Sequence, residues 1–179
     1  MPLRGPILAI AVAAMASVAA MAPHSGARSG ASSPAWTEIT WPFLMDQWGK
    51  GRAFQCRGGD CGGELNLYVR PKIGFCNCTT GVADDAELDR VGDVELISQR
   101  FTPRGDGQPI AVGWMKGRSR TYAVADRRSA LALAFNDRCD VVVATVAGGA
   151  ELPAGAERAA IDFLNSQPVL RWVEVTLGL

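Results

Sequence analysis

The sequence predicts an α+β fold: one domain with an antiparallel, meandering sheet of about seven strands, two packed helices and disulfide staples. Three observations support this prediction. Short runs with strand periodicity follow one another along most of the chain. The connections between these runs are short and rich in turn residues, which implies hairpins and hence antiparallel pairing. The two helical patterns stand apart from the strands instead of alternating with them.

The N-terminal segment has the pattern of a secretory signal peptide. In residues 1–22, Arg4 precedes an apolar run over residues 7–22 that is rich in small residues. This run is shorter than the ~20 apolar residues that a membrane-spanning helix needs. Residues 23–35 are mostly Ser, Gly, Ala and Pro, which predicts a flexible lead-in. We therefore expect an exported protein, periplasmic or secreted, with no stable membrane anchor after cleavage and one folded domain over residues 36–179.

The strand patterns begin directly after the lead-in. Residues 36–43 alternate in polarity, and "GRAFQC" and "ELNLYVR" then flank the turn sequence "RGGDCGG". In the last of these runs Leu65, Leu67 and Val69 alternate with polar residues, which is the period of a half-buried strand. Further strand patterns, separated by short turns such as "KGRS" (116–119), are expected at residues 108–115, 120–126, 129–137 and 139–148.

Two segments have helical patterns. Residues 83–92 predict a short helix that begins at Asp84, with Glu87 three residues later in capping-box spacing. Residues 153–167 predict a second helix, which carries Leu164 on its apolar face. Both helices are expected to cover the sheet.

The end of the chain is predicted to return to the sheet. Pro168 is expected to stop the second helix. Residues 169–177, "VLRWVEVTL", then predict a last strand with Leu170 and Trp172 facing inward. The order of an antiparallel meander, a helix and a terminal strand is similar in architecture to the Mog1/PsbP-type sandwich.

Composition argues against several classes of function. The formal net charge is zero, with 18 basic and 18 acidic residues interspersed, so no field attracts nucleic acid or an anionic membrane. The single histidine, His24, lies in the expected lead-in. A Ser-His-Asp triad, a Cys-His pair or a histidine-ligated metal therefore has no folded imidazole. The sequence favours a non-enzymatic role, with catalysis by carboxylates left open.

Five cysteines suggest two disulfides, which are the default in an exported protein. Cys56 and Cys61 flank a turn across which Cα atoms lie ~4.5–5.5 Å apart, within the disulfide range. Cys76 and Cys78, in "GFCNCTTG", would lie ~6.5–7 Å apart in extended chain, near or beyond that range. We therefore expect Cys139 to bond either Cys76 or Cys78, which leaves the other as the free thiol.

The "CNC" segment supports three interpretations. In the first, the fifth cysteine is a buried structural thiol and no cofactor is bound. In the second, Cys76, Cys78 and Cys139 hold copper or zinc through their thiolates. In the third, the segment takes part in thiol exchange, although it lacks the helix-start setting that lowers a thiol pKa in CxxC enzymes.

An aromatic cluster is the other candidate feature. Trp41, Phe43 and Trp48 lie within eight residues, in "WPFLMDQW". Rings so close together either line a ligand groove or partner surface, or plug one end of the core.

The stretches "WPFxxDxWGxGRAFQC" (41–56) and "GFCNCTTGVADDAELDRVGD" (74–93) resemble an uncharacterised family of exported bacterial proteins. This resemblance covers most of the expected mature chain and implies no particular activity. Together with the missing catalytic groups, it leads us to expect an exported non-enzymatic accessory or binding protein. Its partner would be an unknown protein or small molecule. The alternative is a soft-metal or thiol-redox protein that acts through the "CNC" cysteines.

Overall fold

The computed structural model describes the chain from Trp36 to Leu179. The predicted signal peptide (1–22) and lead-in (23–35) lie outside these residues. The described chain forms one antiparallel sheet of seven strands with four α-helices, and two pairs of cysteines are bonded. The prediction of a disulfide-stapled α+β fold is therefore confirmed, with two more helices than expected.

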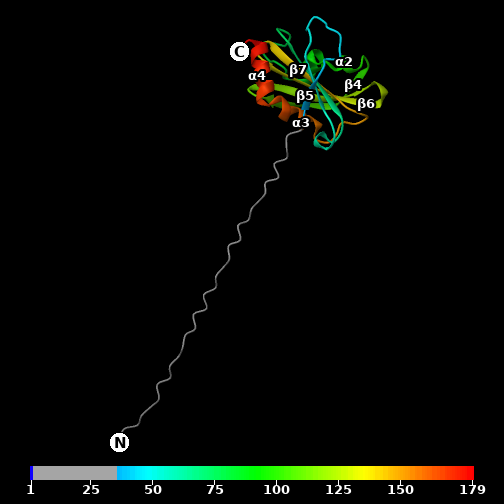
Figure 1. Ribbon diagram of the computed structural model, residues 1–179. Helices are drawn as coiled ribbons and strands as arrows, with labels where there is room; N and C mark the ends of the chain where they lie inside the picture. The colour runs from blue at the N-terminus through cyan, green and yellow to red at the C-terminus, as the bar shows by residue number, and fades with distance from the viewer. Residues whose placement is uncertain (2–35) are drawn as a thin grey trace. The chain divides into compact units, whose positions relative to one another are not determined.

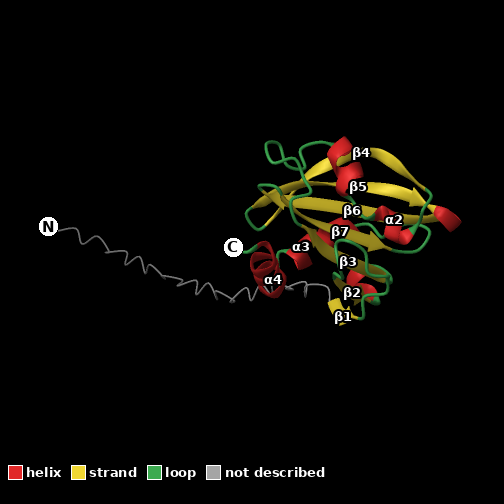
Figure 2. Cartoon of the chain, turned by 90° about the horizontal axis from the view of Figure 1, so that it is seen from above, coloured by secondary structure: helices red, strands yellow, loops and turns green. Residues whose placement is uncertain are grey.

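The sheet consists of two antiparallel meanders placed side by side, in the order β1-β2-β3-β7-β6-β5-β4 (Figure 2). Because β3 pairs with β7, the chain leaves the middle of the sheet after β3 and starts again at the far edge with β4. The strands are β1 (Trp36–Ile39), β2 (Arg52–Cys56), β3 (Leu65–Lys72), β4 (Phe101–Val112), β5 (Met115–Val124), β6 (Arg128–Asp137) and β7 (Asp140–Ala147).

Helices cover both faces of the sheet (Figure 1). One pair follows β7 and packs on one face, and the other pair lies in the crossing segment between β3 and β4 and packs on what we call the α1–α2 face. A single 3-10 turn precedes β3 and another precedes β6. The helices are α1 (Asp85–Val91), α2 (Val94–Ile97), α3 (Ala156–Leu164) and α4 (Gln167–Leu177), and the 3-10 turns are η1 (Gly59–Cys61) and η2 (Ala125–Arg127).

Strand β6 shows how the sequence builds two different cores. Successive side chains of a strand point to opposite faces of its sheet. The large side chains of Leu131, Leu133 and Phe135 belong to the core under α3 and α4. The alternate positions, all alanine, belong to the core under α1 and α2, and are Ala130, Ala132 and Ala134. Small side chains let helices lie close to that face of the sheet.

Helix α1 begins as the sequence predicts. The carboxylate of Asp84, at the N-cap, accepts the backbone N–H of Glu87 at 2.8 Å. The Glu87 carboxylate does not complete a capping box, because it accepts the N–H of Asn77 and pairs with Arg90. The first turn of α1 therefore also holds the "CNC" segment in place.

The final strand predicted over residues 169–177 is wrong, because residues 167–177 form helix α4. Val169 and Val173, four residues apart, are buried against the sheet, which is helical spacing. Pro168 does not stop a helix here. It lies in the first turn of a new one, where its missing N–H has no intrahelical partner to lose. The element order that suggested a Mog1/PsbP-type sandwich is therefore not present in residues 36–179.

The β4–β5 hairpin turns earlier than predicted. Residues 116–119 lie inside β5, and the turn consists of Gly113 and Trp114. Gly113 has a φ of 58°. The first position of a two-residue hairpin turn needs a positive φ, which glycine adopts most readily. Gly117 is a glycine for another reason, since a Cβ there would collide with the backbone of Ala134 on β6.

Candidate functional site

Residues 40–51, which we call the aromatic loop, pack against one side of β3. The rings of Trp41 and Phe43 contact Tyr68, with centroid distances of 6.1 and 4.8 Å. Trp48 packs on Phe75, just beyond the end of β3, at 4.5 Å. All three predicted aromatic side chains are therefore half-buried, and they anchor a loop that has almost no regular structure of its own.

A buried ion network fastens the aromatic loop and α2 to β3. The Arg70 guanidinium, 2% exposed, donates to both carboxylate oxygens of Asp93 at 2.6 and 2.8 Å, and to the Asp46 carboxylate at 2.8 Å. Lys72 pairs with Asp93 at 2.7 Å and donates to the carbonyl of Val91. Because Asp46 belongs to the loop and Asp93 directly precedes α2, one arginine positions both segments.

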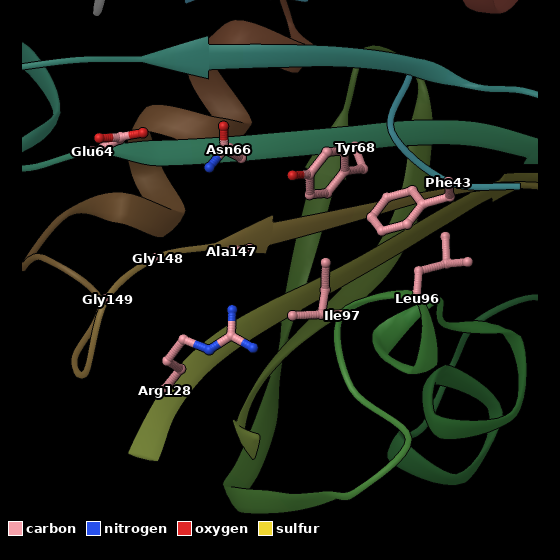
Figure 3. A pocket seen from close by; sticks show the side chains of 10 residues that line it. All are labelled: Phe43, Glu64, Asn66, Tyr68, Leu96, Ile97, Arg128, Ala147, Gly148 and Gly149. Carbon is pink, nitrogen blue, oxygen red and sulfur yellow. The ribbon is translucent and has the colours of Figure 1, made fainter. Parts of the chain in front are cut away.

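Between the aromatic loop and α2 lies a pocket of about 400 Å³, which we call the β3 pocket (Figure 3). In Figure 3 the side chains of Tyr68, Phe43, Ile97 and Arg128 surround a common space. The loop and α2 supply apolar side chains, and β3 and β6 supply polar ones. The lining residues are Phe43, Glu64, Asn66, Tyr68, Leu96, Ile97, Arg128, Ala147, Gly148 and Gly149.

The polar side of the β3 pocket comes mainly from β3. Glu64 and Asn66 both accept hydrogen bonds from the side-chain amide of Gln55, at 2.9 and 3.1 Å. The amide nitrogen of Asn66 is left to donate to a ligand. Burial raises the pKa of Tyr68, so its phenol stays a neutral O–H group that both donates and accepts.

Arg128 distinguishes this pocket. It is half-buried at the start of β6, yet none of the carboxylates whose side chains the structure describes lies within ion-pair distance of it, although Glu64 lines the same pocket. Every other buried or half-buried arginine of the described chain has a carboxylate partner: Arg52, Arg70, Arg118 and Arg120. A half-buried guanidinium with free donors is suited to a carboxylate or another anionic group of a ligand.

Of the three aromatic residues singled out by the sequence, Phe43 lines the β3 pocket, while Trp41 and Trp48 do not. Sequence inspection missed Arg128 and Tyr68. Tyr68 could have been singled out from the sequence, since it lies on the polar side of the alternating pattern of β3. Arg128 could not have been singled out in this way, because only the pairing of β6 with β7, and of β7 with β3, brings it to the pocket.

The cysteines pair as expected from their geometry. Cys56 bonds Cys61 across the β2–β3 connection, with Cα atoms 6.2 Å apart. Cys78 bonds Cys139 at the β6–β7 turn, with Cα atoms 4.2 Å apart. Cys76 is the free thiol, buried, with its N–H bonded to the carbonyl of Cys139 at 3.1 Å. In this arrangement Cys76, Cys78 and Cys139 present one thiol rather than a set of three.

The Cys76 thiol is expected to be unreactive in the folded protein. Burial, reinforced by the nearby Glu87 carboxylate, raises the pKa of this thiol to about 11. At pH 8 only about one thiol in a thousand is then ionised, against roughly a tenth for a cysteine with the ordinary pKa of 9.0. Titration with Ellman's reagent should find no fast thiol in native protein and one thiol per chain in urea.

The same shift makes a pH prediction. Because the folded-state pKa of Cys76 is raised from 9.0 to about 11, its contribution to stability is complete below pH 9 and is lost as the pH rises toward 11. Cys76→Ala should remove this part of the alkaline decline in the urea midpoint. Three thiols appearing after addition of a chelator would contradict the structural interpretation and point to a metal site.

No group of three or more His, Cys, Asp or Glu side chains placed to hold a metal ion is found among the side chains that the structure describes. Within the same residues, none of the helices has the length and apolar character needed to cross a membrane. Two disulfides are typical of proteins that fold in an oxidising compartment. Comparison of the chain with protein-family models, curated proteins and solved structures finds no match.

Proposed function

We propose that this is an exported, non-enzymatic binding protein whose ligand occupies the β3 pocket. The observation that carries the proposal is the half-buried, unpaired Arg128 in a pocket with an apolar wall. Ligand pockets are typically concave and largely apolar, with a few polar groups that fix orientation. The described chain has no histidine, and its one free thiol is buried with a raised pKa. Binding is therefore better supported than nucleophilic catalysis.

The lining predicts the chemical class of the ligand. Arg128 would pair with a carboxylate, and Phe43 and Ile97 would cover an apolar or aromatic body. Asn66 and Tyr68 would hydrogen-bond a polar substituent. A pocket of about 400 Å³ is at the small end of the range for organic ligands, so we expect a small aromatic or branched aliphatic acid.

Arg128→Gln should abolish this selectivity without unfolding the protein. Wild-type protein is expected to bind phenylacetate at least tenfold more tightly than uncharged phenylacetamide, because a hydrogen bond to a charged group is worth about 1.5–3 kcal/mol. Calorimetric titration of Arg128→Gln should show no preference between the two compounds. Arg127→Gln, an exposed neighbour outside the pocket lining, is the matched control. Equal preference in wild type and Arg128→Gln would contradict the role of this arginine.

Export is part of the proposal and has its own test. The apolar run over residues 7–22 and the disulfides both support it. The intact mass of protein recovered from its native compartment should correspond to a chain that begins between residues 19 and 24. Recovery of the full-length chain from the cytoplasm would contradict export while leaving the binding measurement unaffected.

A further inference from the structure

A second surface hollow, of about 300 Å³, lies where the β4–β5 turn and the β6–β7 turn meet the "CNC" segment. It shares no lining residue with the β3 pocket. We call it the Trp114 hollow, and its lining residues are Cys78, Thr79, Thr80, Gly81, Trp114, Lys116, Asn136 and Arg138.

The chemistry of the Trp114 hollow differs from that of the surrounding surface. Trp114 is 46% exposed and pairs with no other ring of the described chain. Lys116 and Arg138 are both exposed and take part in none of the ion pairs of residues 36–179. No carboxylate lines the hollow, since Asp137 and Asp140 flank the β6–β7 turn outside it. Two cations without an ion-pair partner and a partly exposed indole therefore line the same hollow.

The backbone at Arg138 is held in an unfavourable conformation. Its φ is 52°, in the left-handed region that favours glycine. A non-glycine residue there costs stability, and such strain is found preferentially at functional sites. A glycine in this two-residue turn would adopt the same φ without strain, so the arginine here costs stability that a glycine would not.

The hollow is also held rigidly. The Cys78–Cys139 disulfide joins the "CNC" segment to the β6–β7 turn. Asn77 fixes the next turn of chain, because its side-chain oxygen accepts the N–H groups of Thr79 and Thr80 at 2.9 and 3.2 Å. The threonine hydroxyls remain exposed. Rigid placement of polar and aromatic groups lowers the entropic cost of binding.

We propose that the Trp114 hollow binds an acidic saccharide. The indole of Trp114 would stack on the apolar face of a sugar ring, and Lys116 and Arg138 would pair with its carboxylate. The hydroxyls of Thr79 and Thr80 would bond to sugar hydroxyls. Single-stranded nucleic acid also combines stacking with cations, but it requires a longer basic groove and several aromatic platforms. A single ring with two cations fits one acidic sugar better.

Fluorescence titration of the full chain with oligogalacturonate tests this proposal. Wild-type protein should bind the probe, added salt should weaken binding, and a neutral maltooligosaccharide of the same length should bind at least tenfold more weakly. Trp114→Ala and Lys116→Gln should each lower the affinity for oligogalacturonate at least tenfold.

Arg138→Gly separates binding from folding. Glycine adopts a φ of 52° without strain, so this variant should keep or raise the melting temperature while losing at least tenfold in affinity. Arg127→Gly is the matched control, because Arg127 is also exposed and has a φ of 56°, but it lies outside the hollow. Its melting temperature should behave similarly and its affinity should not change.

Unchanged affinity in Arg138→Gly, or absence of oligogalacturonate binding, would overturn the proposal. Tighter binding of a short oligothymidylate than of oligogalacturonate would overturn it in favour of nucleic acid.

Discussion

Asp93→Ala is expected to lower the free energy of unfolding by about 3–5 kcal/mol, because it leaves buried cations without their shared anion. Asp93 is 3% exposed and holds both Arg70 and Lys72, which are 2% and 3% exposed. In the variant Arg70 keeps only Asp46, and Lys72 keeps only backbone carbonyls. Urea denaturation followed by circular dichroism measures the loss.

Glu38→Ala is the matched control for this experiment. Glu38 also accepts two hydrogen bonds from an arginine, Arg52, but its side chain is 53% exposed. Its removal should cost at most about 1 kcal/mol, since water replaces the lost partner. A similarly small loss for Asp93→Ala would mean that Arg70 and Lys72 reach water in its absence, and that the network does not hold the aromatic loop and α2 in place.

Removal of the long-range disulfide is expected to have the second large effect. The Cys78–Cys139 bridge spans 61 residues, which predicts a loss of about 4 kcal/mol in the chain-entropy model. The double variant Cys78→Ala/Cys139→Ala is needed, because the single variant Cys78→Ala leaves Cys139 as a second free thiol on a residue whose carbonyl is hydrogen-bonded to the N–H of Cys76. Urea denaturation under non-reducing conditions gives the difference from wild type.

The Cys56–Cys61 bridge provides the internal comparison. It spans only 5 residues, so the same model gives about 2 kcal/mol for its cross-link alone. Both of its cysteines are buried, so the variant Cys56→Ala/Cys61→Ala also loses packing. A loss below about 1 kcal/mol for the long-range bridge would show that the "CNC" segment is held mainly by its hydrogen bonds to α1 and to the β6–β7 turn.

Much of the fold was predictable because it depends on local patterns. The alternation of Leu65, Leu67 and Val69 identified β3, and the Asp84 cap identified α1. The turn between Cys56 and Cys61 identified their bridge. Each of these features is decided by residues close together in sequence, where turn, cap and strand preferences act directly.

The remainder depended on contacts between distant segments. Whether residues 169–177 form a strand or a helix is decided by the surface that Val169 and Val173 meet, which the local sequence does not show. Arg70 occupies the polar side of an alternating strand, yet it is buried because Asp93 and Asp46 cover it from other elements. Of the residues that line the β3 pocket, Phe43 was singled out from the sequence as part of the aromatic cluster. Arg128 reaches the pocket only through the order of the strands.

Mapping a bound acid onto the chain tests the central claim most directly. Two-dimensional NMR of ¹⁵N-labelled protein during titration with phenylacetate should shift the backbone amides of Phe43, Tyr68, Ile97 and Arg128 together, with one dissociation constant. Over the concentration range that saturates the wild type, the same titration of Arg128→Gln should leave these signals nearly in place, because the variant binds the acid at least tenfold more weakly. Saturable shifts confined to other parts of the sheet, or shifts of the pocket signals that survive Arg128→Gln unchanged, would contradict the assignment of the β3 pocket as a binding site for small organic acids.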